Sequence, residues 1–279
     1  MLASLFTRRG LLSAILATTC LSYASLTADE PAIKPLRVLL VLGGCCHDYM
    51  TQKDLLAEGI TKRAHVEVVI AYDPDKTTKH LNPVYENPDW AKGFDVIIHD
   101  ECSANVDDLA VIDRILEPHR QGLPAVLLHC GMHSFRSQGF PKEVTPWFEF
   151  TGLQTTGHGR QAPIDIHYTA ADHPAIAGLT NWTTINEELY NNSAGKLLDT
   201  ASAVAVGKQT TKNKEGEEKT DEAVVVWTNN YRDGTKVFAT TLGHNNATVS
   251  DDRYLDLVTR GLLWSCGKLN DTYLKNVEQ

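Results

Sequence analysis

The chain has 279 residues, with 26 lysines and arginines against 35 aspartates and glutamates, and a formal net charge of −9 at pH 7. This balance argues against binding to nucleic acid or to anionic membrane surfaces, because both need a positively charged protein face. It is compatible with a neutral, polar ligand. The length allows one large domain with a full hydrophobic core.

The first 28 residues have the pattern of a twin-arginine export signal. Arg8 and Arg9 precede an apolar run at residues 11–21, and small residues allow cleavage after Ala24 or Ala28. The apolar run is short for a membrane span, so an uncleaved anchor is the less favoured alternative. We therefore expect an exported protein, periplasmic or extracellular in a bacterium, without a stable membrane span after processing.

The cysteines do not suggest a disulfide framework. Five remain once Cys20 is removed with the signal: Cys45, Cys46, Cys102, Cys130 and Cys266. An odd number with one adjacent pair is not typical of a disulfide-rich protein, and the absence of C-x-x-C disfavours a cysteine zinc site. We expect a chain that does not depend on disulfides, with the adjacent pair packed as small side chains at a strand end.

Residues 29–279 are predicted to form a single domain, and its first half alternates strands and helices. Apolar runs predict buried strands at residues 37–42, 65–72, 94–99 and 125–128. Helices are predicted at residues 51–64 and 106–120, the second preceded by Asn105 and acids suited to a helix start. This alternation indicates an α/β protein with a parallel sheet and right-handed crossovers, which is a flavodoxin-like pattern.

The second half is less regular. An aromatic helix or turn is predicted at residues 143–151, and a last helix starts at residues 251–252. Strands are predicted at residues 164–168, 203–207, 223–228 and 236–241. The charge-rich run at residues 208–222 is expected to be a solvated hairpin. The chain contains neither G-x-G-x-x-G nor G-x-x-x-x-G-K-[ST], so no nucleotide cofactor is expected, and without G-x-S-x-G a Ser-His-Asp hydrolase is disfavoured.

Histidines follow several of the predicted strands. His47, His99 and His129 come after the first, third and fourth strands, whose carboxyl ends share one edge of a parallel sheet. We expect these three side chains to converge there. Neutral imidazole binds zinc and similar ions and moves protons near neutral pH. A single histidine at the end of a strand is more often structural. The prediction of a metal or proton-transfer site therefore depends on several histidines meeting at one edge.

Five motifs occur in one order along the chain. They are the strand ending at His129, the loop at residues 157–160, the turn at residues 173–174, the segment 187–190, and residues 226–227 followed by 234–238 and 242–244. Together they resemble the ThuA-like (trehalose utilisation) family over about residues 37 to 267. The resemblance implies a class I glutamine-amidotransferase-like fold, a flavodoxin-like three-layer sandwich with a mainly parallel central sheet. It also implies a role in carbohydrate utilisation, especially of disaccharides.

One departure from the amidotransferases concerns their nucleophile. They place a cysteine at a G-x-C-x-G elbow between strand and helix, and we align Gly131 with the last glycine of that motif. His129 then occupies the nucleophile position, and Cys130, one residue later, is expected to point into the packing. This disfavours glutamine hydrolysis through a cysteine.

The candidate reactive residues lie at these motif positions. His47, His129, His158 and His244 are the predicted ligands of a divalent metal such as zinc. His129, His158 and Glu188 are the predicted catalytic residues, because an imidazole or a carboxylate can move a proton or activate water. The alternative for Glu188 is an acidic loop. The Asp48 carboxylate could hydrogen-bond to His47 and orient its imidazole for metal binding, or it could equally cap a helix.

The predicted substrate-binding residues are Tyr49, Ser134, Arg136, Arg160 and Tyr190. The polar members could hold sugar oxygens or serve as helix caps and surface ion pairs. Tyr49 and Tyr190, together with Trp147, could stack on a pyranose face.

Three functions are consistent with these residues. The favoured one is an exported, metal-assisted enzyme, a hydrolase, lyase or isomerase that converts a disaccharide or a keto-sugar. The alternative is a non-catalytic sugar-binding or scaffold protein with the same fold. A cysteine-dependent, amidotransferase-type hydrolase using Cys130 is third. The partner in the first two is a small carbohydrate, and the sequence does not indicate an oligomeric state.

Overall fold

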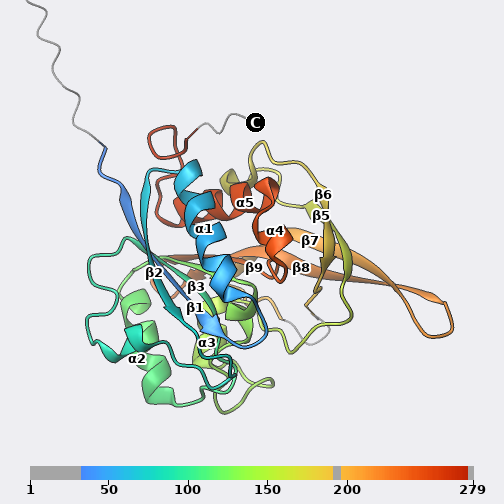
Figure 1. Cartoon of the computed structure of the whole chain (residues 1–279), viewed down its shortest axis with the longest axis horizontal. Helices are drawn as coiled ribbons and strands as arrows, with labels where there is room; N and C mark the ends of the chain where they lie inside the picture. The colour runs from blue at the N-terminus through green and yellow to red at the C-terminus, as the bar shows by residue number, and fades with distance from the viewer. Residues whose placement is uncertain (1–32, 191–195, 276–279) are drawn as a thin grey trace, which may run out of the picture. The chain divides into compact units, whose positions relative to one another are not determined.

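A computed structural model of the protein describes residues 33–190 and 196–275 (Figure 1). The predicted export signal at residues 1–28 lies outside the described residues. The strands are β1 (Leu36–Gly44), β2 (Val66–Asp73), β3 (Val96–Cys102), β4 (Ala125–Leu128), β5 (Ala162–Tyr168), β6 (Trp182–Glu187), β7 (Ala201–Lys212), β8 (Glu218–Tyr231) and β9 (Thr235–Thr240). The helices are α1 (Tyr49–Arg63), α2 (Leu109–Arg120), α3 (Pro146–Thr151), α4 (Asn246–Val249) and α5 (Asp252–Ser265). Short 3₁₀ turns are η1 (Pro83–Glu86), η2 (His129–His133) and η3 (Pro174–Ile176).

The strands form one nine-stranded sheet in the order β2-β1-β3-β4-β9-β8-β7-β5-β6. The first five are parallel neighbours, and their order is that of flavodoxin-like folds. The remaining pairs are antiparallel, so the sheet is mixed and the expectation of a mainly parallel sheet holds only for this first part. For the pairs β7–β8 and β8–β9 the reason is connection length, because the short turns after β7 and β8 can join only antiparallel strands.

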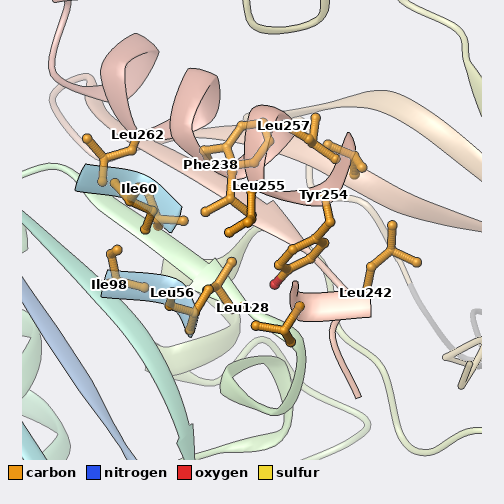
Figure 2. Packing of buried hydrophobic residues seen from close by; sticks show 14 of the residues in the cluster. Leu56, Ile60, Ile98, Leu128, Phe238, Leu242, Tyr254, Leu255, Leu257 and Leu262 are labelled. Carbon is orange, nitrogen blue, oxygen red and sulfur yellow. The ribbon is translucent and has the colours of Figure 1, made fainter. Parts of the chain in front are cut away.

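Helices cover both faces of the parallel part of the sheet. Leu40 and Leu42 of β1 share a core with buried residues of α1 and α5, which Figure 2 shows around Leu128 and Phe238. Val41, whose side chain alternates to the other face, lies in a second core with residues of α2 and α3. These double-sided strands explain the uninterrupted apolar runs in the sequence.

The strands predicted in the first half are confirmed as β1 to β4, and the two predicted helices are α1 and α2. Each helix begins at an aspartate: Asp48 accepts a hydrogen bond from the Thr51 amide at 3.4 Å, and Asp108 one from the Ala110 amide at 2.8 Å. The charge-rich run at residues 208–222 is the end of the β7–β8 hairpin. β6 was not predicted. None of the described helices is long and apolar enough to cross a membrane.

Candidate functional site

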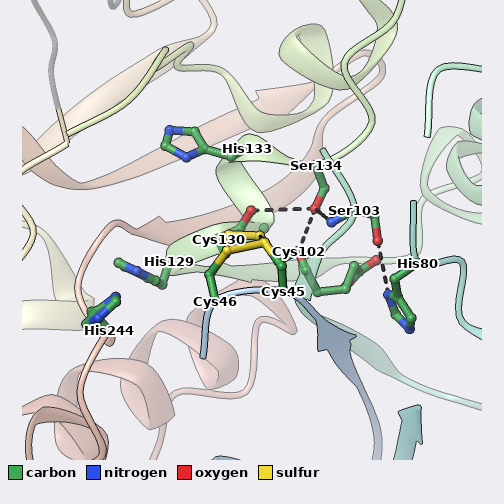
Figure 3. The surroundings of a disulfide bond; sticks show 12 residues. Cys45, Cys46, His80, Cys102, Ser103, His129, Cys130, His133, Ser134 and His244 are labelled. Atoms are coloured by element: carbon green, nitrogen blue, oxygen red, sulfur yellow. Dashed lines mark hydrogen bonds between the residues drawn. A yellow bond between two sulfur atoms is a disulfide. The ribbon is translucent and has the colours of Figure 1, made fainter. Parts of the chain in front are cut away.

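Three histidines meet at the carboxyl edge of the parallel strands. His47 follows β1, His129 follows β4, and His244 follows β9. Each of these histidines offers one ring nitrogen, and the three nitrogens all lie within 4.8 Å of one another. Figure 3 shows His129 and His244 together, and their ring centroids are 5.5 Å apart. The structure therefore brings together three of the four predicted metal ligands.

The backbone at His129 positions its ring. This residue has a φ of +38° and begins the turn η2 directly after β4. Gly131 lets the turn lie against β3, because a Cβ there would stand 2.7 Å from the His99 carbonyl oxygen. His129 Nδ1 lies 2.6 Å from the Thr241 carbonyl oxygen and therefore donates its proton to it. The other ring nitrogen, Nε2, faces Glu188.

Glu188 lies between the imidazoles. Its Oε2 is 3.5 Å from His129 Nε2, 3.4 Å from His158 Nε2 and 3.2 Å from His244 Nδ1. Burial alone would raise the pKa of Glu188, but the contacts with His129 and His244 lower it below its usual range. The same carboxylate raises the pKa of His244. Glu188 is therefore ionised at neutral pH and can accept a proton.

Glu187 has a different task from its neighbour. It is fully buried, and its carboxylate accepts hydrogen bonds from the backbone amides of His244 at 3.1 Å and Asn245 at 3.0 Å. It thus holds the loop after β9, which carries His244, against the end of β6. Of the adjacent acids, Glu188 is the one that faces the histidines.

The nitrogens in this site are poorly satisfied. Among the described residues, no hydrogen-bond partner exists for the buried atoms His47 Nδ1, His129 Nε2 and His244 Nδ1, although the last two lie within ion-pair distance of Glu188. Burial, together with the neighbouring His129 and His244, lowers the pKa of His47 to about 2. His47 is therefore neutral, the form in which imidazole binds metals.

His158 takes a more external position than predicted. Its side chain is 39% exposed, and it contacts Glu188 and stacks on Tyr190, with ring centroids 5.8 Å apart. It is not one of the three histidines whose nitrogens lie within 4.8 Å of one another. It therefore does not belong to the three-histidine group, which corrects the four-histidine metal set. Asp48, the possible orienting group, instead caps α1 and accepts a hydrogen bond from the Asn246 amide group at 2.8 Å.

The prediction for His99 was wrong. Side chains alternate along β3, so His99 points to the face covered by α2, where its Nε2 lies 3.1 Å from His119 Nε2. Asp100, the next residue, was missed. Burial and the neighbouring Glu101 raise the pKa of Asp100 well above its usual range. Burial and the nearby Asp100 likewise raise the pKa of Tyr49, whose ring is near His47. The run of three polar residues at positions 99–101, beginning where the predicted strand ends, was the available signal.

Several predicted substrate-binding residues are used inside the fold. Ser134 Oγ donates to the Glu101 carbonyl oxygen at 2.5 Å and accepts from the Ser103 amide at 2.8 Å. Trp147 is 2% exposed and donates to the Gly131 carbonyl oxygen at 2.9 Å. These contacts correct the expectation that Ser134 binds sugar and that Trp147 stacks on it.

The two tyrosines are buried as well. Tyr190 is stacked on His133, with ring centroids 4.2 Å apart, and lies beside His129 at 4.8 Å. It is 2% exposed and Tyr49 is 3% exposed, so neither offers a free ring face for a pyranose. Tyr190 instead positions the histidines. Burial, together with Arg136, lowers the pKa of His133 to about 3.

The two arginines remain accessible. Arg136 is half-buried, with its guanidinium 4.9 Å from the Phe140 ring centroid, and Arg160 is exposed on the loop that carries His158. A cavity of about 620 Å³ lies beside His47 between the loops after β1 and β2. Its polar lining includes Asp48, Asp73, Asp75 and Lys76. This volume is within the range of small-molecule sites.

The cysteines contradict the expectation for them. Cys45 is bonded to Cys46, and Cys102 to Cys130, while Cys266 is the free cysteine of the described residues. The chain therefore holds disulfides, because β1, β3 and β4 are neighbours and each carries cysteine at its carboxyl end. Cys130 points into the core as predicted and is 4% exposed. Its disulfide further disfavours Cys130 as a nucleophile.

Fold and site together define an α/β protein with a flavodoxin-like strand order and a histidine-rich site at the carboxyl edge of the sheet. The profile of the ThuA family, described as trehalose utilisation, matches residues 37–265. The chain therefore belongs to the ThuA family, as the five motifs predicted. Comparison with curated proteins gives no match.

Two solved structures of ThuA-like proteins share the fold. One, a putative ThuA-like protein from Parabacteroides merdae, is 18% identical, with a TM-score of 0.58, over 84% of this chain and 90% of that chain. The other, from Bacteroides uniformis, is 15% identical, with a TM-score of 0.57, over 88% of this chain and 95% of that chain. At these identities the likeness concerns the fold alone.

Proposed function

We propose that this ThuA-family protein is an exported, metal-assisted enzyme that converts a carbohydrate, either a disaccharide or a keto-sugar. One observation carries the proposal. His47, His129 and His244 direct unsatisfied ring nitrogens to a common place, beside the ionised carboxylate of Glu188. The carbohydrate substrate rests on the family description, trehalose utilisation, and on the polar cavity next to His47.

The donor set fits a divalent transition metal. Imidazole nitrogens suit zinc and similar ions, and three protein ligands leave a position open for water or substrate. In a tetrahedral zinc site with bonds of about 2.1 Å, ligand atoms are about 3.4 Å apart. The three histidines offer nitrogens within 4.8 Å of one another, so small side-chain rotations would complete the site.

Each residue of the site has a role in this proposal. A bound divalent ion would polarise a sugar oxygen or acidify a water molecule. Glu188 would accept the proton, since its carboxylate is ionised at neutral pH. His158 contacts the same carboxylate and is partly exposed, so it would exchange that proton with solvent. The Thr241 carbonyl holds His129 in the tautomer that leaves Nε2 free.

The substrate would enter over the loops after β1 and β2. Carboxylates at Asp48, Asp73 and Asp75 can accept hydrogen bonds from sugar hydroxyls, and Lys76 can donate. Arg136 and Arg160 would bind carbonyl or ring oxygens from the other side of the site. The twin arginine at Arg8 and Arg9 supports the proposed export. We further propose the class I glutamine-amidotransferase-like, three-layer arrangement, which the strand order and the two cores support.

The test is elemental analysis of protein purified without a histidine tag, followed by turnover of a panel of disaccharides and 3-keto-sugars. We expect about one equivalent of a divalent metal and loss of activity on chelation. His244→Ala should lose the metal, whereas His65→Ala, before β2 and outside the three-histidine group, should keep it.

Two outcomes would count against the proposal. Metal below a tenth of an equivalent, with activity unchanged by a chelator, would exclude the metal-assisted mechanism. Sugar affinity without turnover of any member of the panel would instead identify a non-catalytic binding protein.

A further inference from the structure

Four cysteines form a sulfur cluster next to the histidine site. Cys45 and Cys46 follow β1, Cys102 ends β3, and Cys130 lies in the turn after β4. Figure 3 shows both disulfides, Cys45–Cys46 and Cys102–Cys130, side by side at the carboxyl edge of the sheet. Nothing in the proposed carbohydrate reaction uses these sulfurs.

The two disulfides are in contact. Cys45 Sγ lies 3.4 Å from Cys102 Sγ, within the separation of about 3 to 3.5 Å from which reacting atoms attack. Gly44 permits this approach: its φ is +95°, and a Cβ there would stand 2.4 Å from the Cys102 carbonyl oxygen. A side chain at position 44 would therefore push the end of β1 away from β3.

The four cysteines also differ in their exposure to solvent. Cys46 is exposed, whereas Cys45, Cys102 and Cys130 are 9%, 4% and 4% exposed. A reductant in solution can reach the outer pair through Cys46 but not the inner pair directly. The contact between Cys45 and Cys102 is the connection between the two.

We propose that the four cysteines form a thiol–disulfide exchange relay, in which an external dithiol reduces the outer pair at Cys46 and Cys45 passes the two electrons to the inner pair. The partner is a molecule or protein carrying a dithiol. The relay is independent of the proposed carbohydrate chemistry, although reduction would free Cys102 and Cys130 within 4.8 Å of a His47 nitrogen.

Electrons and protons balance in each step of the relay. The external dithiol becomes a disulfide and leaves Cys45 and Cys46 as thiols. The Cys45 thiolate then attacks Cys102 Sγ, forming a Cys45–Cys102 bond, and Cys130 leaves as a thiolate that takes up the proton lost by Cys45. Finally the Cys46 thiolate attacks Cys45 Sγ, restores the outer disulfide and releases Cys102, which is protonated in turn. The net result is one oxidised dithiol and a reduced inner pair.

The relay is tested by trapping its intermediate. Cys46→Ser removes the residue that resolves the Cys45–Cys102 bond. After equilibration of the full chain in a glutathione buffer, alkylation and peptide mass spectrometry should show this bond together with an alkylated Cys130. Cys266→Ser is the matched control, because it removes the cysteine outside the cluster, and it should keep the two original disulfides.

A kinetic measurement keeps the test decisive. The double substitution Cys45→Ser and Cys46→Ser should slow reduction of the inner pair by dithiothreitol at least tenfold. An equal rate in the wild type and the double variant would overturn the relay, as would four thiols holding a stoichiometric metal in the purified protein. His244→Ala should leave the rate unchanged, which separates this test from that of the metal site.

Discussion

Two groups of histidines near the same strands differ in whether their nitrogens are satisfied. The edge cluster, formed by His47, His129 and His244, has buried nitrogens without a hydrogen-bond partner in the described residues. The buried network, formed by His99, by His119 of α2 and by the residues bonded to them, has a hydrogen-bond partner for each imidazole nitrogen. The same residue type therefore builds a candidate binding site at one place and a piece of the core at the other.

The buried network can be followed proton by proton. His119 Nδ1 donates to the Leu123 carbonyl oxygen at 2.7 Å, so its Nε2 accepts the proton of His99 Nε2 at 3.1 Å. His99 Nδ1 and the Tyr85 hydroxyl then both face Glu101 Oε1, at 3.1 and 2.6 Å. Each ring nitrogen has a partner, which is the condition for a buried polar group to stabilise a fold. The edge cluster does not meet this condition, and this is why it is the candidate for ligand binding.

The largest expected effect comes from the carboxylate of the edge cluster. Glu188→Gln preserves shape but removes the charge that three imidazoles contact. We expect turnover to fall about 10²- to 10⁴-fold, the usual contribution of general acid–base catalysis. Stability should fall as well, because His129 and His244 stabilise the ionised carboxylate in the folded chain. Steady-state kinetics and urea unfolding on the same preparation measure both. Turnover within twofold of the wild type would remove Glu188 from the mechanism.

The matching change in the buried network should lower stability without lowering turnover. Glu101→Gln leaves a fully buried His99 without its acidic partner. Breaking a buried pair by removing one member costs about 3 to 5 kcal/mol, so we expect a loss of about 3 kcal/mol in the free energy of unfolding. Turnover per folded molecule should stay within about twofold. A variant as stable as the wild type but inactive would make the network functional and erase the contrast.

A pH series sharpens the comparison further. Burial, followed by the charge of His99, lowers the pKa of His119 to about 3, from 6.5 in the unfolded chain. The unfolded chain therefore binds more protons between these values, so this group's contribution to stability is complete above pH 6.5 and is lost as the pH falls towards 3. Between pH 7 and 5 it should cost about 2 kcal/mol, at about 1.4 kcal/mol per pH unit below 6.5. His119→Gln cannot ionise at this position. Between pH 7 and 5 its free energy of unfolding in urea should therefore fall by about 2 kcal/mol less than that of the wild type. Equal losses would contradict a neutral, buried His119.

The sequence predicted the fold better than the site because the two depend on different information. Apolar runs and helix caps are local, and they located β1 to β4, α1 and α2. The convergence of His47 and His129 also followed, since parallel strands end at one edge. The prediction that His99 joins them was wrong, because a difference of one residue along a strand decides which face of the sheet a side chain occupies. The sulfur cluster was missed, although Cys45, Cys102 and Cys130 also lie at the ends of neighbouring parallel strands. The cysteines were compared only by their spacing along the chain, and not by the strands that carry them.

The smallest effect is expected at the rim of the site. Arg160 is exposed beside His158 and has no ion pair among the described residues, so Arg160→Ala should change the unfolding free energy by less than about 0.5 kcal/mol. If its guanidinium binds a sugar oxygen, KM should rise by less than about tenfold with kcat unchanged, the pattern of an interaction equally strong in ground and transition states. Arg114→Ala, on α2, is the control and should change neither constant. A fall in kcat for Arg160→Ala would instead place the guanidinium at the reacting atoms, and would extend the edge cluster outward to the loop that carries His158.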